Sequence, residues 1–419
     1  MRYPEMIRIR QILDAPKVEN IEEEIDRELA SLKGLGIKRG ERIAITAGSR
    51  GVANIVRILR RIVLKTREAG GEPFLIPTMG SHGGGTAEGQ VEVIRSLGIT
   101  EESVGAPIRS SMEVVEIGTS RYGFPVMVDR HAAEADGIVV VNRIKPHTEF
   151  EGPIESGLMK MMAIGMGKHK GCFEVHRQTV QFGYRAVIPE IGSIILGKLP
   201  ILFGIGIVEN VYDETALIRA VPRSNVLEIE KELLATAKRL MARLPFDRID
   251  VLVVDEMGKN VSGTGMDTNV IGRIMFIGEK EPERPRITRI VVLDLTEATH
   301  GNAVGIGLAD YTTQRLVRKI DLPVMATNAI TAMTPEKGRI PLAMATDQEA
   351  VEAAFQTIGA VQPEEARVVH IRNTLEIGEM EISRSLMEEA RGRAEIQPLR
   401  EIGPLCFDAS GTIRKVATL

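Results

Sequence analysis

Tryptophan is absent from this chain of 419 residues, and all aromatic residues together make up only 4% of it. The chain holds two cysteines, Cys172 and Cys406, which are so far apart in sequence that no disulfide framework is expected. The N-terminal residues lack the apolar core that a signal peptide needs. Together these features fit a reducing compartment, and we expect a cytoplasmic protein.

Long apolar runs and an excess of one charge are missing as well. The most apolar stretch, residues 187–208, is broken by Pro189, Glu190, Lys198 and Pro200. We therefore predict buried strands and turns there rather than a membrane span. The 53 basic and 57 acidic residues leave a net charge of −4, and no basic block or strip of interleaved basic and aromatic residues occurs. This pattern argues against nucleic acid or membrane as a partner.

The chain has a hydrophobic content of 43%, with 41 glycines and 18 methionines. This composition is typical of an α/β enzyme with an aliphatic core and glycine-rich turns. In its first half, short β-branched runs alternate with longer amphipathic ones. Such repetition of strand, loop, helix and strand predicts βαβ units around a parallel sheet. The predicted strands are residues 42–46, 73–77 and 137–142, and the predicted helices are residues 53–69 and 86–97.

A domain boundary is predicted at Pro245, which ends a long amphipathic helix. A new buried strand, residues 249–255, follows it and opens a second set of strands and helices. We predict an α/β fold of two domains, residues 1–245 and 246–393, with parallel or mixed sheets flanked by helices. The tail, residues 394–419, can return to the first domain.

Polar side chains follow directly after three of the predicted strands. They are the pair Ser49 and Arg50, the pair Ser81 and His82, and residues 145–147. In open α/β sheets, ligands bind beyond the carboxyl ends of the strands. The three segments are therefore expected to converge on one crevice.

The segment with the most chemistry-bearing residues spans residues 142–177. It contains three of the seven histidines, His147, His169 and His176, which can act as acids, bases or metal ligands near neutral pH. Lys160 lies among leucine and methionine, so partial desolvation should favour its neutral, nucleophilic form. One short segment thus offers a covalent attachment point, proton-transfer groups and a metal ligand.

The order of these motifs resembles the nickel-pincer-nucleotide lactate racemases and related 2-hydroxyacid racemases and epimerases. That family has a strand followed by Thr-Arg-Pro, a Gly-x-His-Arg loop, a histidine followed by Ser-Gly-Gly-x-Lys, and a later Asn-His-Arg. The similar segments here are Ser49-Arg50-Gly51, Gly80-Ser81-His82-Gly83, His147 with Glu155-Ser156-Gly157-Leu158-Met159-Lys160, and Val175-His176-Arg177.

The resemblance implies a cofactor and a role for each matched residue. The family's cofactor is a nickel pincer nucleotide, a pyridinium-3-thioamide-5-thiocarboxylate mononucleotide joined to a lysine, which would be Lys160. Nickel is held by both sulfurs, a ring carbon and one histidine, which would be His176, with His169 as the rival ligand. His82 and His147 would be the paired acid and base, and Arg50 would hold the substrate carboxylate. The cofactor is expected in a cleft between the domains. It is expected to be missing from recombinant protein that is made without the enzymes of cofactor biosynthesis. Those enzymes are the expected protein partners.

Departures from the family pattern bear on the substrate. Ala47 stands where the family's first loop begins with Asp, and Gly83 replaces the arginine after the loop histidine. The Tyr-Gln-x-x-Lys cluster that contacts lactate in the family has no equivalent in residues 259–273. Lactate itself is therefore not the expected substrate, and a malate-like acid or a sugar acid fits better. The residues expected to contact it are Asn260, Thr268, Asn269 and Arg273.

Two other functions stay open at this point. His82, His147 and His176 could surround zinc and activate water for hydrolysis, although the chain lacks a closely spaced histidine pair. The chain could also be a carrier of nickel or nucleotide that catalyses nothing. His300 and Asn302 are further candidates for a cleft, whereas His131, His370 and Cys172 are expected to have structural roles.

Overall fold

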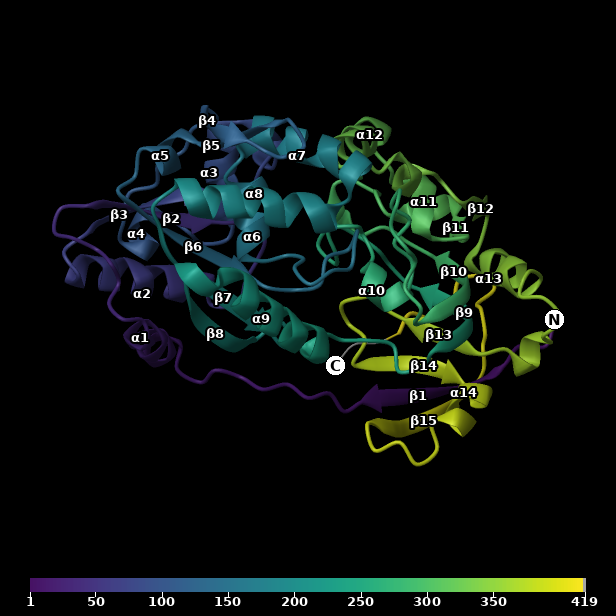
Figure 1. Cartoon of the computed structure of the whole chain (residues 1–419). Helices are drawn as coiled ribbons and strands as arrows, with labels where there is room; N and C mark the ends of the chain where they lie inside the picture. The colour runs from purple at the N-terminus through teal and green to yellow at the C-terminus, as the bar shows by residue number, and fades with distance from the viewer. Residues whose placement is uncertain (417–419) are drawn as a thin grey trace. The chain divides into compact units, whose positions relative to one another are not determined.

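The computed structural model describes residues 1–416 and divides the chain into two compact units. The central unit is Asp14–Met241, and the terminal unit combines Met1–Leu13 with the chain from Ala242 onward. Each contains its own sheet (Figure 1). The α/β fold with mixed sheets and flanking helices is as predicted from the sequence.

The division of the chain differs from the predicted domain boundaries in one respect. Strand β1 (Glu5–Gln11) lies in the terminal unit, where it pairs antiparallel with β14 (Glu379–Ser383) on one side and β15 (Ile396–Pro404) on the other. The tail therefore lies with β1 in the terminal unit and does not return to the central one. These pairings join residues 369 or more positions apart, which no local pattern reveals.

The central unit is built on a five-stranded sheet in the order β3-β2-β6-β7-β8. The first four strands are parallel, and β8 runs antiparallel to β7. The three strands predicted from the sequence are all present, each within a residue of its predicted ends. The bounds are β2 Arg42–Ala47, β3 Glu72–Pro77, β6 Gly137–Arg143, β7 Ile201–Glu209 and β8 Thr215–Pro222, with a separate ribbon of β4 Val114–Thr119 and β5 Pro125–Asp129.

Helices cover both faces of this sheet. The longer ones form where apolar residues recur at helical spacing, as in α2, and where a capping side chain starts the first turn, as Thr86 does for α3. The helices of the central unit are α1 Ile21–Ser31, α2 Ile55–Glu68, α3 Ala87–Ser96, α4 Glu101–Val104, α5 Arg130–Ala133, α6 Leu158–Lys160, α7 Lys168–Phe182, α8 Tyr184–Lys198 and α9 Val226–Leu240.

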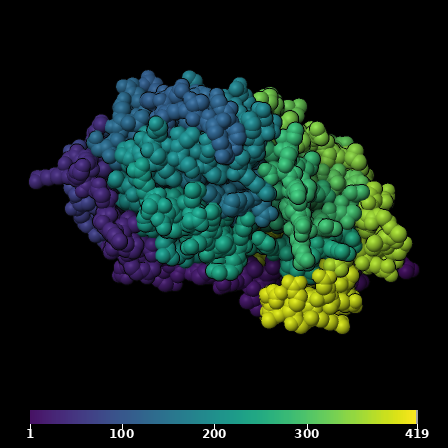
Figure 2. Space-filling model, in the orientation of Figure 1, coloured from purple at the N-terminus to yellow at the C-terminus, as the bar shows by residue number. Residues whose placement is uncertain are grey.

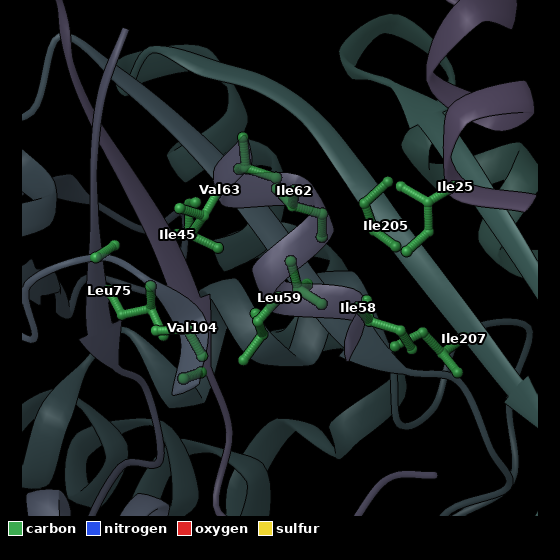
Figure 3. Packing of buried hydrophobic residues seen from close by; sticks show 14 of the residues in the cluster. Ile25, Ile45, Ile58, Leu59, Ile62, Val63, Leu75, Val104, Ile205 and Ile207 are labelled. Atoms are coloured by element: carbon green, nitrogen blue, oxygen red, sulfur yellow. The ribbon is translucent and has the colours of Figure 1, made fainter. Parts of the chain in front are cut away.

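Strand β7 shows how the two faces are filled. Ile205 and Ile207 point to the face on which α1 and α2 pack, and they join one continuous apolar cluster there (Figure 3). Gly204 lies on the opposite face, where an added Cβ would meet the side chain of Leu158 in α6 at 2.6 Å. The glycine therefore lets α6, which ends in Lys160, lie directly against the sheet.

The stretch 187–208 was predicted as strands and turns, and this prediction is wrong for its first half. Helix α8 occupies Tyr184–Lys198, and only the second half forms a strand, β7. Pro189 lies inside this helix, and a proline at that position in the sequence had favoured an interpretation without a helix. An apolar run of this length does not by itself distinguish a buried helix from a strand.

The terminal unit contains an eight-stranded mixed sheet in the order β12-β11-β10-β9-β13-β14-β1-β15. The first five strands are parallel and the last three pair antiparallel. The yellow residues that include β15 gather on the surface in Figure 2. The remaining bounds are β9 Arg248–Val254, β10 Arg286–Val292, β11 Tyr311–Thr313, β12 Leu342–Met344, β13 Val368–Ile371, α10 Thr268–Ile271, α11 Gln314–Arg318, α12 Leu322–Thr331, α13 Asp347–Phe355 and α14 Arg384–Glu389.

Among residues 1–416, the helices are too short or too polar for any of them to span a membrane.

Helix α2 offers a matched test of the core. Leu59 is fully buried in the apolar cluster, whereas Leu64 on the same helix is 42% exposed. We expect Leu59→Ala to lower the free energy of unfolding by about 2–5 kcal/mol, because it leaves a cavity. Leu64→Ala should change it by less than about 1 kcal/mol. Urea titration measures both, and equal losses in the two variants would contradict this packing.

Candidate functional site

The loops that follow β2 and β3 meet at the carboxyl edge of the central sheet. The Oγ atom of Ser49 lies 2.5 Å from Nδ1 of His82, so a hydrogen bond joins the two loops. Since β2 and β3 are parallel neighbours, their carboxyl ends lie at the same edge, as the sequence predicted. The His82 side chain is exposed at this edge.

Arg50 lies next to Ser49 and is exposed as well. Among residues 1–416 it forms no salt bridge, whereas nearby Arg143 is paired with Glu209. A guanidinium without a carboxylate partner retains all its donors for a ligand. The role of Arg50 as a carboxylate clamp stays a prediction.

Glu230 of α9 holds the turn that carries Lys160. The Glu230 carboxylate accepts a hydrogen bond of 2.9 Å from the backbone N–H of Met159. A Cβ on Gly157 would lie only 2.2 Å from Glu230 Oε1, so only glycine fits at the start of this turn. Burial raises the pKa of Glu230 to about 8, although the N–H groups of Met159 and Leu158 lower it.

His147 lies in direct contact with Lys160. The Nζ atom of Lys160 is within hydrogen-bonding distance of His147 Nε2. The other ring nitrogen, Nδ1, accepts a hydrogen bond of 3.1 Å from the backbone N–H of Glu149, and therefore carries no proton in that arrangement. Glu155 holds the backbone on this side by accepting from the His147 N–H at 2.7 Å, and Lys238 pairs with it at 2.7 Å.

The electrostatics of Lys160 favour its neutral amine. Its pKa is lowered to about 8, mainly by burial and also by the positive charges of Arg50 and Lys145, while Glu149 and Cys172 oppose the shift. At neutral to mildly alkaline pH a substantial fraction of the amine is therefore unprotonated. That form is the nucleophile which covalent attachment requires.

His176 is oriented by a chain of hydrogen bonds that ends at a carboxylate. The Tyr184 hydroxyl donates to Glu149 Oε2 at 3.0 Å, and His176 Nδ1 lies 2.9 Å from the same hydroxyl oxygen. Because a carboxylate only accepts, the tyrosine oxygen is left to accept from Nδ1–H. When this imidazole is neutral, its Nε2 is the unprotonated nitrogen that can ligate a metal, although Cys172 and Glu149 raise the His176 pKa and so favour the protonated ring.

Cys172 lies one helical turn before His176 and is buried. Burial raises the pKa of its thiol, but the charge of His176 and hydrogen bonds from His176 and Ser81 outweigh this and lower it. Burial likewise disfavours the charged form of His176, yet Cys172 and Glu149 raise its pKa above the ordinary value. A Cβ on Gly80 would lie 2.8 Å from the Cys172 sulfur, so the glycine lets the His82 loop approach the thiol.

Comparison with known proteins gives this site a context. Residues 9–185 match the family model of the lactate racemase N-terminal domain. These residues are lactate racemase-like. The span contains Arg50, His82, His147, Lys160 and His176, all in the order of the family's motifs.

The fold agrees over most of the chain. The crystallised apoprotein of lactate racemase from Thermoanaerobacterium thermosaccharolyticum matches 86% of this chain and 95% of its own, with a TM-score of 0.51 and 14% sequence identity. At this identity the likeness shows a shared fold only. No curated protein matches the sequence at a significant level. The resemblance to lactate racemases that the sequence motifs suggested is thus supported by both the family model and the fold.

The predicted substrate contacts of the terminal unit have structural partners of their own. The Arg273 guanidinium donates to Leu308 O at 2.9 Å and pairs with Asp310 at 2.8 Å, and it reaches two further carbonyls in β10. These contacts favour a structural role for Arg273. Thr268 is fully buried, Asn269 donates to Asp267, and Asn260 accepts from Thr296, so none of these residues is placed at a ligand by the geometry of this unit.

His169, His300, His370 and Asn302 each have surroundings of their own. His169 is exposed beside Gly85, which favours His176 over it as the metal ligand. His300 is exposed with a left-handed backbone, and Asn302 donates to Asn328. His370 is buried between Asp255 and Glu381, which outweigh its burial and raise its pKa to about 9. The structural role expected for His370 agrees with this arrangement.

Residues 1–416 contain no group of three or more His, Cys, Asp or Glu side chains arranged to hold a metal ion. A zinc site made by His82, His147 and His176 would need such a group. The structure therefore gives no support to the zinc hydrolase considered from the sequence.

Sequence reasoning missed the residues that support the site. Glu149, Tyr184 and Glu230 were not singled out, and Cys172 was assigned to packing. The pattern His147-x-Glu149 and the four-residue interval from Cys172 to His176 were visible signals, since i and i+4 share a helix face. Glu230 lies 70 positions from Lys160 and gave no signal.

The reactivity of Lys160 tests its lowered pKa. In a pH series with a small amine-acylating reagent, labelling of the Lys160 peptide should be half-maximal near pH 8, because its pKa is about 8. Lys17 is a control, since its hydrogen bond to Glu214 raises its pKa above the ordinary value and its labelling should begin only at higher pH. Mass spectrometry of the peptides measures both profiles. Parallel profiles for the two lysines would rule out a desolvated Lys160.

The fit at Gly157 can be tested by adding one methyl group. Gly157→Ala should lower the free energy of unfolding by about 1–3 kcal/mol and disturb the Lys160 turn, because the new Cβ meets Glu230. Gly197→Ala in α8 is the matched control, since no atom lies within 4 Å of its added Cβ. It should leave stability unchanged or raise it by about 0.5–1 kcal/mol. Urea titration that finds both variants as stable as the parent would refute the close contact.

Proposed function

We propose that this chain is an isomerase, a racemase or epimerase of a 2-hydroxyacid, that works with a nickel pincer nucleotide tethered to Lys160. The observation that carries the proposal is the Lys160 amine, which is desolvated, lacks a carboxylate partner within hydrogen-bonding distance and touches His147. The lactate racemase-like match of residues 9–185 supports the same assignment.

The donor set of the central unit fits this cofactor. A thioamide link needs one nucleophilic amine, and Lys160 has the lowered pKa that makes it one. His176, which Tyr184 holds through Nδ1, would be the residue that binds the nickel of the cofactor. The chemistry that the bound cofactor supplies is reversible acceptance of hydride from substrate C2.

The protein's own residues bind the substrate and move its proton. Arg50 holds the carboxylate through two parallel hydrogen bonds, which fixes C2 relative to the cofactor. His82 and His147 are the proposed groups that each accept the hydroxyl proton from one stereoisomer and return it to the planar keto acid, and for His147 this requires the tautomer in which Nε2 is unprotonated and the hydrogen bond from Glu149 N–H is given up. Ser49 orients the His82 ring through its contact with Nδ1. Leu158 and Met159, which precede Lys160 in this turn, are fully buried, whereas Lys160 itself is partly buried.

For the substrate we propose a malate-like acid or a sugar acid rather than lactate, because the family's lactate-contacting cluster is absent from residues 259–273. The enzymes that make the cofactor are the proposed protein partners, since the tether must be delivered to Lys160. Asn260 and Asn269 remain the proposed polar contacts of the terminal unit.

The test is inversion of configuration at C2 without loss of the hydrogen bound there. Protein co-expressed with the cofactor-making enzymes is given a panel of C2-deuterated 2-hydroxyacids, including malate, sugar acids and lactate, and stereochemical scrambling is followed by chiral chromatography. We expect at least one acid to be racemised or epimerised with retention of deuterium. Lys160→Met should reduce the rate by on the order of 1,000-fold or more, since it removes the tether. Lys170→Met changes an exposed lysine nearby in the sequence and should retain the parental rate.

Each result separates the candidate functions. Full activity in Lys160→Met would contradict the tethered cofactor. Bound nickel and nucleotide without C2 scrambling of any acid would instead favour the carrier function. Hydrolysis by protein that lacks the nucleotide would favour the zinc enzyme.

A further inference from the structure

A second buried lysine lies beside the site and contacts neither the Lys160 turn nor the histidines. Lys168 is the first residue of α7 and is fully buried. Its ammonium lies 2.9 Å from Asp129 Oδ2, and it donates to Pro77 O at 2.5 Å and to Gln90 Oε1 at 2.9 Å. These contacts join the end of β3, the end of β5, α3 and α7 at one point.

The ammonium fixes which way the Gln90 amide faces. Because Oε1 accepts from Lys168, the amide nitrogen must point to the opposite side. There Nε2 donates to Gly80 O at 2.8 Å and lies 3.4 Å from His82 O. Gln90 is fully buried, so these bonds are shielded from water. One amide thus holds the main chain on both sides of Ser81.

Few side chains pack the loop from residue 80 to residue 89. Gly83, Gly84 and Gly85 all have left-handed backbones, and none of them has a side chain to pack. The loop is also attached by Gly80 N–H to Gly165 O at 3.2 Å, by the contact of Ser49 with His82 and by hydrogen bonds of Ser81 to the Cys172 thiol. The Gln90 amide is a buried attachment that reaches two of the loop's carbonyls.

Lys168 itself has a strained backbone, with φ of +51°. A lysine rarely adopts this conformation, and such strain persists only where surrounding contacts impose it. Four residues further on, the same helix carries Cys172, and eight residues further on it carries His176. The Lys168 contacts therefore link the start of the helix that carries the proposed nickel ligand to the loop that carries His82.

We propose that Gln90, oriented by Lys168, is a positioning residue that holds the His82 main chain in register with α7. Its catalytic consequence rests on the proposed function, because His82 serves there as an acid and base. Neither residue touches the substrate in this proposal. A loop displaced by about 1 Å loses roughly 100-fold in rate, which sets the scale of the expected effect.

The variant that isolates this role is Gln90→Glu. The carboxylate has the same shape and still accepts from Lys168, so the buried ammonium keeps its partner. It cannot donate, so both loop carbonyls lose their hydrogen bond. Gln90→Met serves as a second variant without the added charge. Lys168→Met is less informative, because it leaves Asp129 buried without its partner and endangers folding.

The experiment has two arms. In cofactor-free full-length protein, hydrogen exchange followed by mass spectrometry should show the amides of residues 79–86 exchanging about 10-fold faster or more in both variants, with α2 unchanged. In cofactor-loaded enzyme, kcat should fall by about 10- to 100-fold while KM stays within about threefold. Thr66→Val is the matched control, since it removes a buried hydroxyl in α2 that has no hydrogen-bond partner.

Loop exchange at the parental rate in both variants would overturn the positioning role. A loosened loop with unchanged kcat would overturn its catalytic consequence. The exchange arm needs no substrate, so it tests the positioning role even if the loaded protein is not a racemase. Failure of the proposed function would show separately, as a lack of racemase or epimerase activity in the parent enzyme.

Discussion

The burial of one amine without a direct carboxylate partner is the constraint on which the rest of the site depends. Lys160 forms no salt bridge within residues 1–416, and its hydrogen-bonding contact is the His147 imidazole. A buried ammonium in such a place is costly, so the neutral form becomes accessible near physiological pH. Folding thus produces a nucleophile at the edge of a parallel sheet, where ligands of α/β proteins bind.

Buried carboxylates keep this arrangement in place from three directions. Glu230 holds the turn before Lys160, Glu155 holds the main chain of His147, and Glu149 orients His176 through Tyr184. Two of the three act on backbone N–H groups rather than on other side chains. Such contacts fix position without neutralising the functional groups, which is how a site can be both rigid and reactive.

The sequence revealed those parts of the site whose signals are local. Arg50 and His82 follow recognisable buried strands, and Lys160 and His176 lie in one short segment with unusual composition. Contacts between segments that are distant in sequence could not be predicted from it. Glu230 reaches the Lys160 turn from α9, and β1 crosses to the terminal unit to pair with β14 and β15. Helix α8 was mistaken for strands, because Pro189 lies inside it and a short apolar run does not by itself distinguish a buried helix from a strand.

The most direct measurement of the central claim is the mass of the peptide that contains Lys160. The full-length chain would be produced together with the cofactor-making enzymes, digested and compared with the same peptide from protein produced alone. The account predicts an added mass equal to the nucleotide joined through a thioamide, located on Lys160 by fragmentation. An unmodified Lys160 in a preparation that still racemises or epimerises a hydroxyacid at C2 would contradict it.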